Sequence, residues 1–267
     1  MTHARALTIA GSDCSGGAGI QADLKTFMAF QVFGMSAVTA VVAENTIGVQ
    51  AVHDVPVDVV LQQIRSCIED IGADAVKIGM LSSPEIVRAV AGAVRDLRLP
   101  NVVLDPVMVA KSGDPLLAEA ARQTLRDHLL PLARVITPNR MEAEVLAGRP
   151  IADLDGMKDA AEALHRLGCE WVVVKGGHMP GLGGAVDIAF DGRGHHELRS
   201  PFFETPHTHG TGCTFSSAIA AGLARGREPL EAIRTAKEYI AEAIRTAAGF
   251  GHGHGPTNHL AGVTSRW

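Results

Sequence analysis

The stretch "HTHGTGCTF" at residues 207–215 holds residues whose types and spacing can do chemistry. Gly210 and Gly212 lack a Cβ, so the backbone N–H groups beside them can point at a ligand. The small apolar residues that follow predict a helix over residues 214–224. The N-terminus of a helix attracts anions through its dipole and its unpaired N–H groups. We therefore predict an anion site at residues 210–213, suited to a phosphoryl group in transfer.

Cys213 is expected in the first turn of that helix, beside Thr211. A helix dipole lowers the pKa of a thiol at this place, so Cys213 could accept a proton from a hydroxyl group or hydrogen-bond to it. The alternative is a small buried thiol that packs behind a glycine turn. The local motif leaves both interpretations open.

Two other motifs follow predicted strands. Asn139 and Glu142 come directly after Thr137-Pro138. If a helix begins there, residues three apart share a face and can order magnesium-bound waters and phosphate oxygens. An N-cap residue with glutamate at the third helical position explains the same spacing equally well. Lys175 of "KGGH" offers an ammonium group for a nucleotide phosphate.

Other patterns carry less information. The chain has no G-x-x-x-x-G-K-[ST] motif, and "GSDCSGGAG" at residues 11–19 departs from the strict dinucleotide fingerprint, so a tight turn explains it equally well. His252, His254 and His259 in "GHGHGPTNH" suggest a metal site only weakly, because no cysteine or acidic residue lies beside them.

The elements that must position these motifs follow from hydrophobic patterning. Near-continuous apolar runs predict strands covered on both faces, at residues 6–12, 36–43, 73–81, 101–108, 134–139 and 171–177. Helical periodicity predicts helices over residues 57–72, 84–97, 115–130, 157–167, 214–224 and 229–247. Residues 185–200 predict a hairpin with its turn at Asp191-Gly192.

This alternation predicts a single α/β domain over residues 1–267, a central, mostly parallel sheet with helices on both faces. Ligands bind such sheets beyond the C-terminal ends of the strands. Those ends read "GSDCSGGAG", "AENTIG", "KIGM", "DPVMVAKSGD", "TPNRMEAE" and "KGGH". Any one of them could be an ordinary surface turn, but we expect the set to face one crevice.

Composition limits the partners. The formal net charge of -5 and the aromatic content of 4% argue against nucleic-acid binding. No apolar stretch approaches the roughly 20 residues of a membrane span. The four cysteines are scattered without C-x-x-C spacing, which predicts reduced thiols in a cytoplasmic protein.

Taken together, the motifs resemble the ribokinase-like superfamily. Within it, the chain is most similar to the bacterial hydroxymethylpyrimidine/phosphomethylpyrimidine kinases of thiamin biosynthesis. The resemblance runs nearly end to end, through "LTIAGSDCSGGAGIQADLKTF", "AENTIGVQ", "KIGML", "DPVMVAKSGDPLL", "TPNRMEAE", "KGGH", "THGTGCTFSSAIA" and "GHGHGPTNH".

The resemblance implies ATP-dependent phosphorylation of 4-amino-5-hydroxymethyl-2-methylpyrimidine, and then of its monophosphate to the diphosphate, by a homodimer that uses Mg²⁺. It assigns the anion hole at the γ-phosphate to Gly210, Thr211, Gly212 and Cys213. In many relatives outside this branch an aspartate base replaces the cysteine. The residues expected at ATP are Lys175, Asp105, Asn139 and Thr211, and those expected at Mg²⁺ are Asn139 and Glu142. The pyrimidine pocket maps to Gly11, Asp23, Val42, Glu44, Met80 and Val107.

Glu44 departs from this family pattern, which usually has glutamine at the position. An amide both donates and accepts hydrogen bonds, whereas an ionised glutamate only accepts. We expect that either Glu44 or the aminopyrimidine ring binds in its protonated form, or that the pocket prefers a different substrate.

Two alternative functions remain at this level. A pyridoxal or pyridoxine kinase also acts on a hydroxymethyl group of a six-membered nitrogen ring. A non-catalytic ligand sensor on the same fold is the more remote alternative, because the glycine loop and its acidic partners are all present. Phosphoryl transfer requires exclusion of water, and residues 107–116, with Lys111 and Gly113, are the candidate lid.

Overall fold

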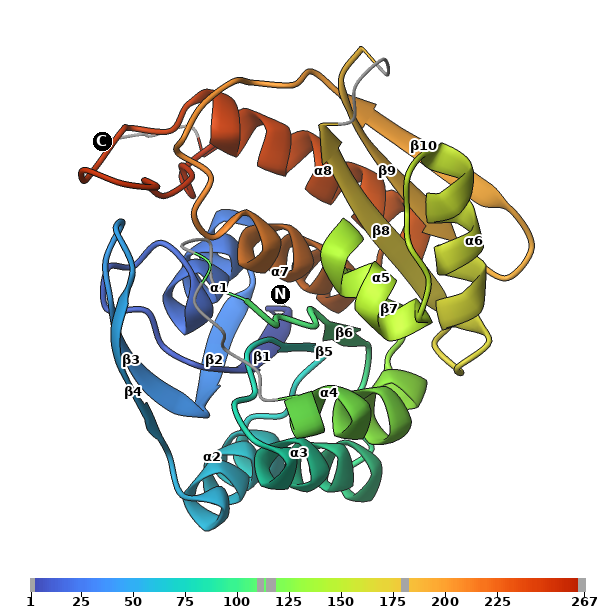
Figure 1. Ribbon diagram of the computed structural model, residues 1–267. Coiled ribbons are helices and arrows are strands. Elements are labelled where there is room, and N and C mark those ends of the chain that lie inside the picture. Colours follow the sequence, from blue (N-terminus) through green and yellow to red (C-terminus); the bar gives the residue numbers. More distant parts are fainter. Residues whose placement is uncertain (1–2, 110–112, 114–118, 179–182, 264–267) are drawn as a thin grey trace.

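The computed structural model describes residues 3–109, 113, 119–178 and 183–263. Its main sheet has eight strands in the order β10-β9-β8-β7-β6-β5-β1-β2 (Figure 1). The strands are β1 (Arg5–Ala10), β2 (Phe33–Val38), β5 (Ala75–Ile78), β6 (Val102–Leu104), β7 (Val135–Ile136), β8 (Trp171–His178), β9 (Ala185–Phe190) and β10 (His195–Ser200). Strands β2, β1, β5, β6, β7 and β8 pair in parallel, and β9 and β10 extend the sheet as antiparallel strands. The predicted α/β architecture is confirmed.

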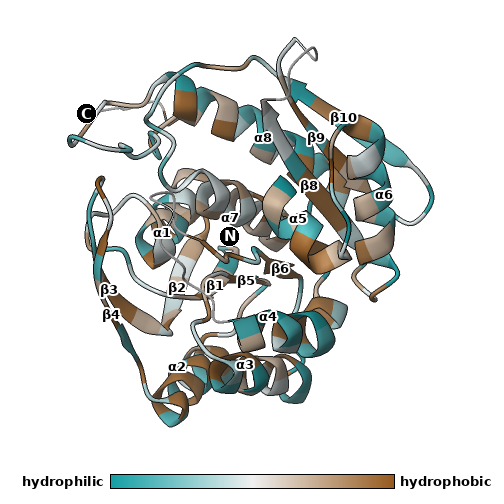
Figure 2. Ribbon diagram, in the orientation of Figure 1, coloured by the Kyte–Doolittle hydropathy of each residue, from teal (hydrophilic) through white to brown (hydrophobic). Residues whose placement is uncertain are grey.

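Helices cover both faces of this sheet. Two separate clusters of buried apolar side chains show the division. One cluster lies under α2 (Val57–Asp70), α3 (Pro84–Asp96), α4 (Glu119–Thr124), α5 (Arg140–Ala147) and α6 (Leu154–His165). The other lies under α1 (Gly19–Ala29), α7 (Thr211–Ala224) and α8 (Pro229–Arg245). Figure 2 shows the hydrophobic residues concentrated on the strands and on the inner sides of the helices.

The hairpin and most helices lie where the sequence predicts them. In the β9–β10 turn, Asp191 Oδ1 accepts from the N–H groups of Arg193 and Gly194, each at 2.8 Å. The helix predicted over 115–130 is shorter: α4 passes into a π-helical turn at Leu125–Leu129 and a 3-10 turn at Leu130–Leu132, and residues 115–118 lie outside the described part. Helix α1 was not predicted from the sequence.

One predicted strand is wrong. Residues 36–43 divide at Thr39 between β2 and a strand of a second, two-stranded sheet formed by β3 (Ala40–Glu44) and β4 (Val49–Asp54). The Thr39 N–H donates to Ala10 O and its hydroxyl donates to Met80 O, so the chain is fixed at the point where it leaves the main sheet. The small sheet lies to one side of the main one in Figure 1.

None of the helices in the described residues combines the length and the apolar character needed to cross a membrane.

Candidate active site

The start of α7 forms a backbone cradle that depends on glycine. Gly210 is the N-cap residue and has a left-handed φ of 76°, which side chains rarely tolerate. A Cβ there would also collide with the carbonyl oxygen of Gly17. The first intrahelical bond runs from Thr214 N to Gly210 O, so the helix supplies no acceptor for the N–H groups of Gly212 and Cys213. Thr211 fixes the turn, since its hydroxyl donates to Thr208 O at 2.7 Å.

A pair of opposite charges lies directly beside this cradle. Lys175 Nζ, on β8, donates to Asp105 Oδ1 at 3.0 Å, and Asp105 follows β6. A Cβ on Gly212 would lie 3.2 Å from Asp105 Oδ2 and 3.3 Å from Lys175 Nζ, which places the pair against the cradle. Asp105 is 1% exposed, and its Oδ2 is buried without a hydrogen-bond partner.

Asn139 and Glu142 form the N-terminal cap of α5. Asn139 Oδ1 accepts from Glu142 N at 2.9 Å, and Glu142 Oε2 accepts from Asn139 N at 2.7 Å, so the capping interpretation of their spacing is confirmed. Glu142 also lies close enough to Asp105 and Lys175 for their charges to affect its carboxyl group. Burial and the charge of Asp105 raise its pKa to about 7, against the opposing charge of Lys175. A capping role and a role toward a cation are therefore compatible in this residue.

A small cluster of apolar side chains joins β3 to the segments that follow β5 and β6, where the predicted ring pocket would lie. Val42 and Met80 are buried together with Ala40, and Val107 packs against them. A Cβ on Gly11 would lie 3.0 Å from Met80 Sδ and 3.7 Å from Val42 Cγ2. Four of the residues predicted at the pyrimidine thus lie together.

The loop between β1 and α1 connects the pocket with the cradle. Ile20 N donates to Gly11 O at the pocket end, and Gly17 lies against both Gly210 and the His209 ring at the cradle end. Glu44 ends β3, two residues after Val42, and is half-buried.

Asp23, also predicted at the pyrimidine, lies in the core and not among these apolar side chains. It is 0% exposed. Its Oδ2 accepts from Lys77 Nζ at 2.8 Å and from Thr8 Oγ1 at 2.6 Å, and its Oδ1 accepts from Ser217 Oγ at 2.7 Å. With both oxygens bound inside the core, Asp23 ties α1 to α7, and its charge acts on the Cys213 thiol at the cradle.

The expected lowering of the Cys213 pKa is wrong. Burial raises the pKa of this thiol to about 12, and the nearby charges of Asp23 and Asp105 raise it as well, while Lys77 opposes them. Desolvation outweighs the helix dipole because the thiolate would have to form beside two carboxylates. Cys213 therefore holds its proton at neutral pH.

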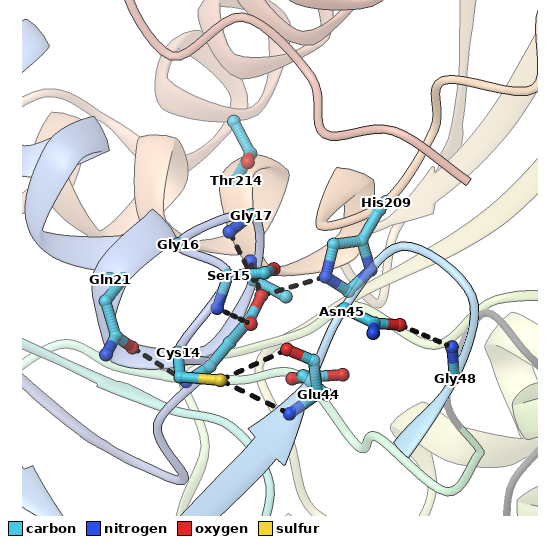
Figure 3. A network of polar contacts seen from close by, with 12 residues as sticks. Cys14, Ser15, Gly16, Gly17, Gln21, Glu44, Asn45, Gly48, His209 and Thr214 are labelled. Carbon is cyan, nitrogen blue, oxygen red and sulfur yellow. Dashed lines mark hydrogen bonds and ion pairs between the residues drawn. The ribbon is translucent and has the colours of Figure 1, made fainter. Parts of the chain in front are cut away.

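Residues that the sequence analysis passed over form a second polar network (Figure 3). Asp13 Oδ2 accepts from His209 Nε2 at 2.8 Å, from Ala18 N at 2.6 Å and from Gly17 N at 3.0 Å, and Oδ1 accepts from Ser15 N at 2.8 Å. In the sequence, Asp13 is an acidic residue inside a glycine-rich loop. This pattern indicates a carboxylate that accepts hydrogen bonds from the N–H groups of the loop.

The C-terminal histidines have structural partners. His259 Nε2 lies 3.1 Å from Thr214 Oγ1, and burial lowers the pKa of His259 to about 4. His254 N donates to Thr46 O at 2.7 Å, so this loop packs on the β3–β4 connection. The candidate lid at residues 107–116 lies largely outside the described residues.

The fold and this strand-end site place the chain among the ribokinase-like small-molecule kinases. The family model described as Phosphomethylpyrimidine kinase matches residues 13–258. The chain is 47% identical to the hydroxymethylpyrimidine/phosphomethylpyrimidine kinase of Bacillus subtilis, over 98% of this chain and 96% of that protein. It is 50% identical to the enzyme of the same name from Haemophilus influenzae, over 96% of each chain. The crystal structure of an ADP complex of Bacillus subtilis pyridoxal kinase superposes with a TM-score of 0.91 at 45% identity, covering 97% of this chain and 98% of that one. The chain belongs to the phosphomethylpyrimidine kinase family, as its motifs predicted.

Proposed function

We propose that this kinase transfers the γ-phosphoryl group of ATP to the hydroxymethyl group of 4-amino-5-hydroxymethyl-2-methylpyrimidine, and then phosphorylates the monophosphate to the diphosphate. One observation carries the proposal: the N–H cradle at residues 210–213 lies against the Asp105–Lys175 pair, and the β1–α1 loop links it to the apolar cluster of Val42, Met80 and Val107. A hydroxymethyl group on a ring in the pocket would face a phosphoryl group in the cradle.

ATP with Mg²⁺ fits the residues present. The buried, unpartnered Asp105 Oδ2 is an oxygen ligand of the kind that Mg²⁺ prefers, and Glu142 and Asn139 place further oxygens close by. When bound, Mg²⁺ would neutralise phosphate charge as it develops. Lys175 would bind a phosphate oxygen of the nucleotide, and Thr211 would hold the turn that presents the cradle.

The chain supplies mainly charge stabilisation and positioning. Backbone N–H groups of Gly212 and Cys213 would bind the transferring phosphoryl group, which in a loose transition state carries charge on its three equatorial oxygens. Because the Cys213 thiol keeps its proton, it is not the base. In such a transition state the alcohol need not lose its proton early, so a strong base is not required.

The test is a product assay. The purified protein is incubated with Mg²⁺-ATP and the hydroxymethyl aminopyrimidine, and the products are followed by phosphorus NMR and mass spectrometry. We expect the monophosphate first and the diphosphate later. Turnover of pyridoxal with no phosphorylation of the aminopyrimidine would contradict the proposal.

Pyridoxal phosphorylation is the second candidate activity. The 45% identity with a protein named pyridoxal kinase supports it, and pyridoxal also carries a hydroxymethyl group on a six-membered nitrogen ring. Competition between the two alcohols in the same assay separates the candidates.

We also propose a homodimer in the cytoplasm. In the small sheet Val41 is 56% and Val52 is 45% exposed; Val41 is paired with His53 and Val52 with Val42, so each face of the sheet carries an exposed valine, as expected of an element that a second subunit covers. The four cysteines are free, which suits a reducing compartment. Light scattering on the purified protein tests the dimer.

A further inference from the structure

Three ionisable side chains from distant parts of the chain, Asp13, Glu44 and His209, converge at the end of β3; Figure 3 shows Glu44 and His209 there. Asp13 comes from the loop after β1, Glu44 from the end of β3 and His209 from the loop before α7. One carboxylate oxygen of each acid and a ring nitrogen of the histidine all lie within 4.8 Å of one another. Asp13 and His209 are buried, and Glu44 is half-buried.

The charge of Asp13 is fixed by its surroundings. Burial alone would raise its pKa, but hydrogen bonds from His209, Ser15 and Ala18 outweigh that effect and lower the pKa to about 2. Since the carboxylate can only accept, His209 Nε2 carries the proton in their 2.8 Å contact. Its oxygens are occupied by N–H donors, so Asp13 is a permanent negative charge and a poor ligand for a cation.

Glu44 is held next to that charge by its main chain. The Cys14 thiol donates to Glu44 O at 3.1 Å and accepts from Glu44 N at 3.4 Å. The β3–β4 register also shifts between Ala43 and Glu44, an irregularity of the kind that redirects a side chain near a site. Ionisation of Glu44 would therefore put a second negative charge beside Asp13 in a half-buried place.

We propose that Asp13, oriented by His209, keeps the Glu44 carboxyl in its protonated form, so that Glu44 recognises a ring nitrogen and an adjacent amino group together. The neutral acid has one O–H donor and one carbonyl acceptor, the same pair that an amide offers. This inference rests on the proposed function for the identity of the ring, and it assigns positioning roles to Asp13 and His209.

The pH dependence follows from the direction of the shift. Burial and the neighbouring charge of Asp13 together raise the pKa of Glu44 to about 7, against the opposing effect of His209. Below pH 7 the carboxyl is neutral and can donate to the ring nitrogen. Above pH 7 it ionises, loses its donor and only accepts. Affinity for the aminopyrimidine is thus expected to fall as the pH rises through about 7.

Other ionisable groups near the cluster do not reproduce this behaviour. His259 has its pKa lowered to about 4, so it is already neutral at pH 6. Lys25 donates to Gly16 O at 2.7 Å. His254, on the loop that packs against Thr46, has its Nδ1 3.2 Å from Pro206 O. Cys14 contacts only the main chain of Glu44 in the bonds described above.

Infrared difference spectroscopy on the protein without substrate tests the protonation directly. The carboxyl C=O band that disappears in Glu44→Gln is followed from pH 5 to 9. We expect a midpoint near pH 7 in the unsubstituted protein. Asp13→Asn should move the midpoint down by about one pH unit, because it removes the neighbouring negative charge. His209→Gln keeps an N–H donor but removes an imidazole that can carry positive charge, so it should move the midpoint up.

Opposite shifts in these two variants distinguish an electrostatic role from a structural one, since simple loosening of the loop would move both in the same direction. If Asp13→Asn does not fold, the proposal is still tested by the midpoint of the unsubstituted protein and by the direction of the shift in His209→Gln. A midpoint near 4.5, the ordinary value for glutamate, would overturn the proposal whatever the enzyme's activity.

Kinetics supply the second readout. The KM for the aminopyrimidine should rise about tenfold per pH unit above pH 7 in the unsubstituted protein, and should stay flat in Glu44→Gln. Glu85→Gln, an exposed position on α3, is the control and should keep the original profile. A midpoint near 7 without any aminopyrimidine turnover would contradict the proposed function but would leave the protonation of Glu44 established. Turnover with identical profiles in Glu44→Gln and the unsubstituted protein would overturn the inference alone.

Discussion

The two halves of the site are built differently. The phosphate half consists of the cradle at residues 210–213 and the Asp105–Lys175 pair, and it belongs to the main sheet and its helices. The ring half consists of Val42 and Glu44 on the two-stranded β3–β4 sheet, which is separate from the main sheet in the described residues, together with Met80 and Val107. Backbone geometry and paired charges fix the first half, whereas side-chain volume and one titratable carboxyl define the second.

This difference separates chemistry from specificity. Transition-state charge is stabilised by groups that do not reorganise, so the phosphate half must be rigid. Ring recognition is a difference of affinities, and a single side chain can change it. Substitutions in the first half should therefore reduce kcat for every alcohol, while those in the second should change KM for particular rings.

The largest effect is expected from Gly210→Ala. The new Cβ would collide with Gly17 O and would sit at a φ of 76°, so the cradle must move. Loss of its N–H geometry should lower kcat by about 10³-fold, as loss of a preorganised donor does elsewhere. Gly226→Ala is the matched control: its φ is 78°, and nothing lies within 4 Å of the added Cβ. Equal kcat in both variants would show that the cradle has no role.

The second-largest effect is expected from Lys175→Gln. Its kcat should be lower by about 10²-fold, because a nucleotide phosphate loses its contact with an ammonium group in a site shielded from water. Lys237→Gln is the control for loss of a buried ion pair, since Lys237 Nζ lies 2.8 Å from Asp187, which is on the neighbouring strand β9 and not on the strand that carries Lys175. Breaking either pair should cost about 3 kcal/mol of unfolding free energy, measured by denaturant titration. If the two variants lose the same activity, stability alone explains the result and the phosphate half is not special.

How far these halves can be predicted from sequence depends on the range of the interactions. The cradle was visible because two glycines and a run of small residues specify it locally. The buried bonds of Asp23 were not visible in the sequence, because its partners Thr8, Lys77 and Ser217 lie 15, 54 and 194 residues away along the chain. Nothing in its own helix indicates that the carboxylate faces the core.

The same reasoning covers the errors. The dipole effect on Cys213 is local and easily predicted, but the desolvation that exceeds it comes from distant residues. The division of residues 36–43 at Thr39 depends on acceptors at Ala10 and Met80, while the apolar run itself is uninterrupted. The pocket residues came from the family resemblance, because valine and methionine have no chemistry that marks a site.

Met80→Ala addresses the ring half. Met80 is 9% exposed and contacts Val42, so truncation opens the pocket wall. We expect the KM for the aminopyrimidine to rise about tenfold, which corresponds to about 1.4 kcal/mol, with kcat and the KM for ATP little changed. Met35→Ala is the control in the main core, where truncation should lower stability by about 2–5 kcal/mol without changing KM. A fall in kcat with Met80→Ala would mean that the two halves are coupled.

Cys213→Ala should have the smallest effect, although the residue lies where the two halves meet. Its pKa of about 12 leaves no thiolate at neutral pH, and alanine preserves the backbone N–H that the cradle uses. We expect kcat to fall by less than about tenfold, with the same dependence on pH from 6 to 9, since a loose transition state needs little help from a base. Cys169→Ala, a thiol 1% exposed in the main core, controls for loss of packing. A 10³-fold loss in Cys213→Ala, with one ionisation missing from the kcat profile, would make the thiol a base. The phosphate half would then depend on a titratable group as the ring half does, and the contrast between rigid chemistry and adjustable specificity would not hold.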